Sequence, residues 1–504
     1  MAENKLYLPV LYFFLLCWQI VTLSANLSLL MLKRLNLFAA FVFFILKLTA
    51  QAPKQIALID VIVVDVEKGQ LIKNQVVIIN ENRIEDIIPL TSKPNLANYQ
   101  LIPGNGNYLM PGLIDSHLHL FYYIKSNKWE QLKLTFKLML ANGITGIREA
   151  GASVYTPEMI SLRDSLDKKY FPGPRMYVSG ITTTSNLKKF QVSAYSDLVD
   201  TFSKIGVNGI KIKFTNLKET IEIIDAAKRH HLKVYGHTAN SWRNEPSNIQ
   251  GDFTMEAIAH GISGVMHTGG YVPVDNNKLP SGPEPVFSNE SKRWEDWWLY
   301  FDALWLYADS GAEQNLINNM ISKKVWLEPT FSVESHPMSY ADLIRKKALQ
   351  YYFYPDSSLI QGYPFPKGGQ LDTARQAFRR KQLFVKKFYD AGGLLLAGTD
   401  GSLYGSDLRD ELFYLAAAGI PIAAVIKIVT YNNASALGWL NDMGTVTKGK
   451  LANLILLKND PLQNLSSLEK IEAVFSNGNY YSKKIIDSWV EEIKKQALKE
   501  KGKK

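Results

Sequence analysis

The chain has 504 residues, of which 46% are hydrophobic and 21% are charged, a composition typical of a globular protein and not of a disordered one. This length is enough for one large domain and a smaller one. The formal net charge is +10, but the basic residues form no stripe interleaved with aromatic residues, and we therefore expect no nucleic-acid partner.

The first 52 residues have the pattern of a leader. After Met31, a basic pair, a mostly apolar run and the small residues of Ala50-Gln51-Ala52 follow one another. This order is typical of a signal peptide with its cleavage site. We therefore predict a signal peptide over residues 31–52, an upstream apolar extension over residues 1–30, and export to the periplasm or the extracellular space.

An uncleaved leader is the alternative. Residues 6–32 carry no charge, and about 20 apolar residues are enough to span a membrane as a helix. In that case the protein would be anchored in a membrane through its leader. The single cysteine, Cys17, lies in the same run, so a chain cleaved after the leader has no disulfide, cysteine nucleophile or thiolate metal ligand.

Both ends of the remaining chain have strand-like sequences. Residues 56–89 alternate β-branched and polar residues between turn signals, and a similar texture returns after Gly444. Two β-rich ends that flank a long middle predict a small β-sandwich domain, with its first part in residues 53–108 and its second part in residues 441–485. The lysine-rich residues 486–504 are predicted as a basic C-terminal tail.

The middle of the chain, residues 109–440, alternates short apolar strands with helical patterns. Such alternation predicts a parallel sheet, and eight units of this length fit a (β/α)8 TIM barrel with insertions. An open doubly wound sheet is the alternative, but no glycine-rich phosphate loop follows the first strand. The eight predicted strands lie in residues 109–120, 144–151, 174–181, 209–214, 234–239, 263–270, 325–331 and 394–401.

Polar residues follow the apolar runs of several predicted strands. In a barrel, the chemistry is carried by residues at these carboxyl-terminal strand ends. The first strand ends in two histidines that alternation places on one face, where they can hold one metal ion. Two histidines at this spacing often occur by chance, but four histidines, a lysine and an aspartate at successive strand ends do not. The candidate metal ligands are His117, His119, Lys211, His237, His267 and Asp400.

The motifs around these residues resemble the amidohydrolase superfamily, and within it the imidazolonepropionase-like and prolidase-like enzymes. The resemblance covers residues 56–485, and its most specific pieces are MPGLIDSHLHL, GITGIREAG, GPRMYVSG, GIKIKF, HGISGVMHTG, AGTDGS and GTVTKGKLANLILLKNDPLQNL. The chain departs from the family pattern at three positions. Glu149 and Asn453 stand where the family usually has aspartate, and Arg409 stands where relatives often carry histidine.

The resemblance implies a metal-dependent hydrolase with one or two divalent ions, zinc being the favoured metal. It implies that His117, His119 and Asp400 hold the more buried ion and that His237 and His267 hold the second. A carboxylated lysine would bridge the two ions. Lys211 is the first choice for this bridge, and Lys213, two residues further along the same strand, is the reserve choice.

The reaction implied is hydrolysis of a C–N bond in an amide, a peptide-like compound or a cyclic amide by a metal-activated hydroxide, with Asp400 as the catalytic acid and base. Ring deamination and ester or lactone hydrolysis with the same metals remain open, and a non-catalytic barrel that binds a ligand is disfavoured by the complete ligand set. The substrate would be a small molecule or a short peptide. His336, Tyr271 and Arg148 are weaker candidates for substrate contacts, and homo-oligomerisation remains open.

Overall fold

We analysed a computed structural model of the chain. The leader and His336 lie outside the residues that it describes, so the apolar extension, the signal peptide and the substrate contact of His336 stay predictions. Among the residues described, no helix is long and apolar enough to cross a membrane. The structure describes residues 55–120, 128–213, 215–238, 252–268, 271–273, 303–335, 369–401 and 405–501.

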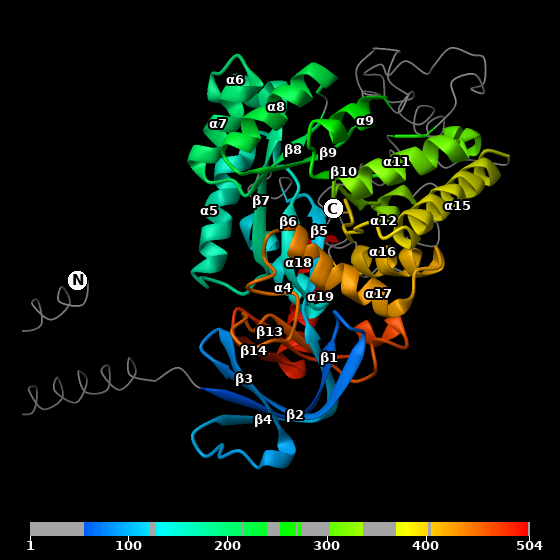
Figure 1. Cartoon of the computed structure of the whole chain (residues 1–504). Coiled ribbons are helices and arrows are strands. Elements are labelled where there is room, and N and C mark those ends of the chain that lie inside the picture. The colour runs from blue at the N-terminus through cyan, green and yellow to red at the C-terminus, as the bar shows by residue number, and fades with distance from the viewer. Residues whose placement is uncertain are drawn as a thin grey trace, which may run out of the picture. The chain divides into compact units, whose positions relative to one another are not determined.

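Strands from both ends of the chain form one seven-stranded sheet, in the order β14-β13-β12-β4-β1-β2-β3. Its neighbouring strands are antiparallel, except that β1 and β4 are parallel. Figure 1 shows the N-terminal strands β1–β4 beside the C-terminal strands β13 and β14. The strands are β1 (Ile56–Asp65), β2 (Gln70–Asn80), β3 (Arg83–Pro89), β4 (Gln100–Pro111), β12 (Leu454–Leu457), β13 (Ile471–Ser476) and β14 (Asn479–Ser482).

The prediction that both chain ends share one β-rich unit is therefore confirmed, but the predicted sandwich is replaced by a single hydrogen-bonded sheet. Register shifts interrupt the pairing of β1 with β2 between Ile59 and Val63, and such irregularities bend a sheet. One buried apolar cluster runs along the sheet from Leu58 of β1 to Leu109 of β4 and Phe475 of β13. The bent sheet therefore buries an apolar core of its own.

A second sheet contains seven parallel strands in the order β11-β10-β9-β8-β7-β6-β5. This curled sheet confirms the first seven strands that were predicted for the middle of the chain. Because its spatial order follows the chain order without reversal, the doubly wound alternative is wrong. The strands are β5 (Leu113–Leu118), β6 (Ile144–Glu149), β7 (Arg175–Thr182), β8 (Gly209–Ile212), β9 (Lys233–Gly236), β10 (Gly264–Met266) and β11 (Trp326–Glu328).

The eighth predicted strand, residues 394–401, contacts both edges of the curled sheet without forming a regular strand. Leu327 of β11 donates a backbone hydrogen bond to Leu394 at 3.0 Å, and Ser116 of β5 donates one to Ala397 at 3.1 Å. Isolated bridges also join this segment to β5 and β11. The segment therefore lies between the first and last strands of the sheet.

Helices follow most of the parallel strands, and Figure 1 shows α5, α7, α8 and α9 flanking them. The helices are α4 (Trp129–Ala141), α5 (Thr156–Asp167), α6 (Thr184–Phe190), α7 (Tyr195–Ile205), α8 (Leu217–Arg229), α9 (Asp252–Ala259), α11 (Ser310–Ser322), α12 (Phe331–Glu334), α15 (Gly369–Asp390), α16 (Ser406–Ala417), α17 (Ile422–Lys427), α18 (Asn433–Ala436) and α19 (Lys483–Lys501). Short 3-10 helices are η1 (Leu90–Ser92), η2 (Ser153–Tyr155), η4 (Trp305–Tyr307) and η7 (Leu465–Glu469), and η6 (Ile428–Asn432) is a short π-helix.

Local sequence signals explain where these helices begin and end. Helix α4 ends at Ala141, and Gly143 follows with φ +78°, a backbone conformation that glycine adopts readily at helix ends. Helix α8 begins with a capping box in which Asn216 and Glu219 satisfy each other's backbone N–H groups. The first of these signals ends α4 shortly before β6, and the second starts α8 shortly after β8.

The basic stretch that was predicted as a tail is helical as far as Lys501. One face of α19 is buried through Ile486, Trp489 and Ile493. Lys137 of α4 and Glu492 of α19 form an ion pair at 2.7 Å. Described lysines of this helix, such as Lys484 and Lys495, therefore lie on the exposed side of a packed amphipathic helix.

Candidate metal centre

The candidate ligands sit where the parallel strands end, and the backbone is held tightly there. The N–H groups of Thr399 and Asp400 both donate to the carbonyl oxygen of His117, at 3.1 and 2.7 Å. Asp400 and His267 have φ values of +45° and +66°, in a left-handed region that costs such residues of order 1–3 kcal/mol each. Strain of this kind persists where surrounding contacts fix it, which is typical of functional sites.

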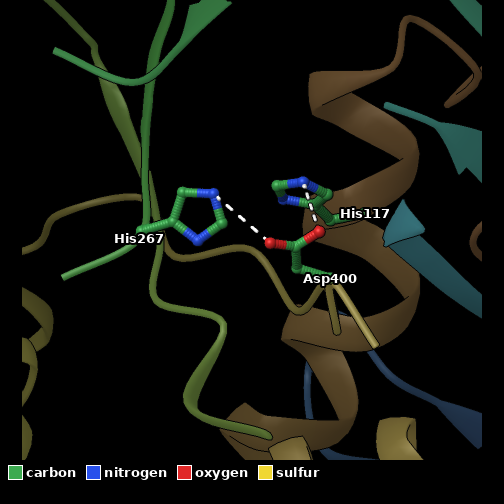
Figure 2. A group of neighbouring side chains, drawn as sticks. All are labelled: His117, His267 and Asp400. Carbon is green, nitrogen blue, oxygen red and sulfur yellow. Dashed lines mark ion pairs between the residues drawn. The ribbon is translucent and has the colours of Figure 1, made fainter. Parts of the chain in front are cut away.

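Asp400 is the centre of the cluster, and three histidines point toward its carboxylate. The Nε2 atoms of His117 and His119 lie 3.5 and 3.0 Å from Oδ1 of Asp400, and Nε2 of His267 lies 3.7 Å from Oδ2. Figure 2 shows the rings of His117 and His267 on either side of the Asp400 carboxylate. Residues from β5, from the end of β10 and from the segment after β11 thus converge on one point.

The remaining two candidates adjoin the same cluster. The ring centroid of His237 lies 4.4 Å from that of His267. Nζ of Lys211, on β8, lies 3.0 Å from Nε2 of His117. Lys213 follows the end of β8 and is half-buried. The structure therefore brings all six predicted ligands together, and it places Lys211 directly against a histidine of the cluster.

Electrostatics in the cluster favour neutral imidazoles at three of its four histidines, beside an ionised carboxylate. Burial lowers the pKa of His267 to about 3, and it also lowers the pKa values of His117 and His237. Burial would lower the pKa of His119 as well, but its contacts with Asp400 and Glu149 outweigh burial and raise it. Burial opposes ionisation of Asp400, yet the surrounding histidines hold its pKa well below the usual value.

The environment of Lys211 favours its neutral amine. Burial lowers the pKa of Lys211 from 10.5 to about 7, and the nearby Lys213 adds to this effect, whereas Asp400 opposes it. Lys211 is 1% exposed, so burial and not repulsion between cations is the main cause. A neutral lysine amine is the form that can react with carbon dioxide.

This donor set suits a divalent metal ion, because zinc and its neighbours bind imidazole nitrogen and carboxylate oxygen. His117, His267 and Asp400 offer ligand atoms that all lie within 4.8 Å of one another. Among the described residues, the buried Nε2 of His267 has no hydrogen-bond partner. This trio combines His117, which was predicted for the first ion, with His267, which was predicted for the second, and both rings face the carboxylate of Asp400.

Comparison with known families identifies this arrangement. A model of the amidohydrolase family matches residues 108–480, which include every candidate ligand. The chain belongs to the amidohydrolase family. Membership makes it a hydrolase that acts on carbon–nitrogen bonds. The family is typically metal-dependent. No curated protein matches the chain in a sequence search.

Solved structures share the fold of this amidohydrolase. A protein assigned as a prolidase from Bifidobacterium longum is 21% identical with a TM-score of 0.60, over 88% of this chain and 99% of its own. A Xaa-Pro dipeptidase with bound methionine is 19% identical with a TM-score of 0.60, over 85% and 100%. Bottromycin amidohydrolase is 16% identical with a TM-score of 0.62, over 89% and 92%. These likenesses show the fold.

Two buried carboxylates beside the amidohydrolase cluster were not predicted from the sequence. Asp115 accepts hydrogen bonds from the N–H groups of His117 and Thr399 and from the Thr399 hydroxyl, and burial raises its pKa to about 7. Glu328, at the end of β11, lies 3.3 Å from Nδ1 of His117. Both residues are acidic groups within apolar strand sequences, a signal that could have found them.

The predicted substrate contacts of two residues receive no support from their positions. Arg148 is fully buried and forms an ion pair with Glu328. Tyr271 is 3% exposed and packs among apolar residues, with ring centroids 6.2 Å from Trp305 and 5.9 Å from Phe384. Arg148 contributes to the charge balance of the buried core of the curled sheet, and Tyr271 contributes to the packing of neighbouring apolar side chains.

Proposed function

We propose that this amidohydrolase is a metal-dependent enzyme that hydrolyses the C–N bond of an amide, a peptide-like compound or a cyclic amide. The observation that carries the proposal is the convergence of three histidines on the Asp400 carboxylate with Lys211 beside them. A divalent metal held by this cluster would activate water and polarise the scissile carbonyl.

Asp400 is the proposed proton carrier. Its low pKa keeps the carboxylate ionised at neutral pH, so it can accept a proton from the attacking water. The protonated carboxyl group can then donate that proton to the leaving nitrogen, which balances the reaction. The side chain of Asp400 is 24% exposed, so its oxygens are within reach of a bound substrate.

Finer features of the site belong to the same proposal. We infer that zinc is the metal, that one or two ions bind, and that Lys211 carries a carboxyl group that bridges them, with His237 and His267 on the second ion. Residues 394–401 would act as the eighth strand of a closed barrel, and their hydrogen bonds to both edge strands support this. Two of the similar structures are named as a prolidase and a Xaa-Pro dipeptidase, which favours a short peptide or an N-acyl amino acid as substrate.

A substrate panel tests this function. Purified protein loaded with zinc should release a free amine from some members of a set of dipeptides, N-acyl amino acids and cyclic amides, measured by mass spectrometry. Asp400→Asn should lose this turnover. Ammonia release from ring amines would instead identify a deaminase, and turnover of esters or lactones alone would identify the other alternative. Protein that binds neither metal nor any of these substrates would contradict the proposed enzyme.

Export is a separate proposal, supported by the charged, apolar and small-residue order after Met31. We expect the mature chain to begin near Gln51 or Pro53, because a signal peptidase cleaves after small residues. Amino-terminal sequencing of protein from its native source measures this directly. Recovery of residues 1–30 intact in a membrane fraction would show that the leader is an anchor.

A further inference from the structure

A buried polar cluster lies behind His117, on the side away from Asp400. Glu328 is fully buried at the end of β11. Its Oε1 atom accepts a hydrogen bond from the Ser116 hydroxyl, and its Oε2 atom accepts one from the Arg148 guanidinium. The three residues come from β5, β6 and β11, so the cluster ties together both edges and an inner strand of the curled sheet.

Arg148 and Ser116 offset part of the cost of burying the Glu328 carboxyl group, although burial still raises its pKa. An isolated buried carboxylate is costly and becomes favourable only when a cation and hydrogen-bond donors compensate its charge. Arg148 supplies the cation, and its guanidinium carbon lies 4.3 Å from the ring centroid of Tyr235, a favourable cation–π arrangement. A Cβ atom on Gly398 would lie 2.6 Å from Oε1 of Glu328, so glycine at this position leaves room for the carboxylate.

The two nitrogens of His117 face different partners. Nδ1 has no hydrogen-bond partner among the described residues, and it lies 3.3 Å from Oε2 of Glu328. Nε2 lies 3.0 Å from Nζ of Lys211 and 3.5 Å from Oδ1 of Asp400. A neutral imidazole has one N–H group and one lone pair. A carboxylate beside Nδ1 favours the proton on that nitrogen, which leaves the lone pair on Nε2 directed at the cluster.

We propose that Glu328, held by Arg148 and Ser116, is a positioning residue that fixes the tautomer and ring orientation of His117 for metal binding. This inference rests on the proposed function, because it assumes that the cluster holds a metal ion. Carboxylates that accept a hydrogen bond from a metal-binding histidine raise its basicity and orient its ring. Arg148 thereby acts through Glu328 and His117, and not through the substrate.

The test is the metal affinity of Glu328→Gln, which keeps the size of the side chain but removes its charge. We expect its dissociation constant for zinc, measured by competition with a chromogenic chelator, to rise roughly 10–100-fold. The visible spectrum of the cobalt-loaded variant should also shift, because the donor strength of His117 changes. Ser116→Ala removes one hydrogen bond to Glu328 and should weaken zinc binding by roughly fivefold.

Glu313→Gln is the matched control. Glu313 is also a buried glutamate, and it pairs with Arg380 and Lys387 of α15 and not with the cluster. The control variant should bind zinc as wild type does, even where its thermal stability falls. Folded Glu328→Gln and Ser116→Ala proteins with wild-type zinc affinity and an unchanged cobalt spectrum would overturn the inference.

A measurement on wild-type protein keeps the inference testable where Glu328→Gln does not fold. In metal-free protein with 15N-labelled histidine, His117, assigned from its absence in His117→Gln, should carry its proton on Nδ1. Observation of the Nε2–H tautomer would overturn the inference. Wild-type protein that binds no divalent metal would instead contradict the proposed function, so the two failures are distinguishable.

Discussion

Replacing His119 by alanine should abolish most activity and lower the metal content while the fold survives. His119 is suited to this test because its side chain is 19% exposed, so its removal leaves no sealed cavity. Its Nε2 atom lies 3.0 Å from Asp400. A catalytic metal contributes several kcal/mol to transition-state stabilisation, and a loss of about 4 kcal/mol corresponds to roughly a 10³-fold fall in kcat/KM.

His230→Ala is the control for this prediction. His230 follows α8, and its Nε2 atom lies 2.7 Å from Asp200 at the surface, so the same chemical change there should leave both metal content and kcat/KM near wild type. Metal content is measured by elemental analysis and the fold by thermal unfolding. A His119→Ala protein with full metal content and full turnover would contradict the assignment of His119 as a ligand.

The sequence predicted the curled sheet well because each of its strands is a short apolar run between a helix and a polar strand end. Seven of the eight predicted strands appear in the sheet. The eighth predicted segment contains Gly398 and a left-handed Asp400, and this backbone makes contacts to both edge strands without a regular ladder. Such backbone geometry is decided by the neighbouring strands, which a local pattern does not contain.

The candidate ligands were predictable because alternation and strand ends are local features of the sequence. The residues behind them were harder to predict, because their roles depend on partners that are distant in the chain. Glu328 lies 212 residues from Ser116 and 180 from Arg148 in sequence, and only the folded sheet shows that these residues share one buried cluster. Arg148 was predicted as a substrate contact for the same reason, since a lone arginine at a strand end has no partner visible in the sequence.

The seven-stranded sheet formed by both chain ends shows the same limit of prediction from the local sequence. The alternating residues of both chain ends predicted strands, and these strands are present. The joining of all seven strands in one sheet depends on the pairing of Met110 in β4 with Ile455 in β12, two residues that are far apart in the chain. Likewise, the lysines after residue 485 suggested a solvated tail, whereas Trp489 is buried and holds α19 as a packed helix.

The second large effect is expected at Lys211. If a carboxyl group on Lys211 bridges two metal ions, Lys211→Ala should lose the second ion and most of the turnover, whereas Lys213→Met should retain both. The reason is position, since Nζ of Lys211 lies 3.0 Å from His117 and Lys213 follows the strand end. Metal stoichiometry and kcat/KM are the measurements. An inactive Lys213 variant beside an active Lys211→Ala variant would move the bridge by two residues.

Chemical rescue and pH dependence make the prediction for Lys211 specific. Short carboxylic acids should restore part of the activity of Lys211→Ala by filling the bridging position, and bicarbonate should activate wild-type protein that was reconstituted without carbon dioxide.

The pKa of Lys211 is about 7 in the folded chain and 10.5 for the free side chain, so between these values the unfolded state binds more protons. The contribution of Lys211 to the stability of the metal-free wild-type protein should therefore rise with pH from about 7 to about 10.5. Lys211→Met lacks this contribution, so equal pH dependence of unfolding in the two proteins would contradict a buried, readily neutralised amine at Lys211.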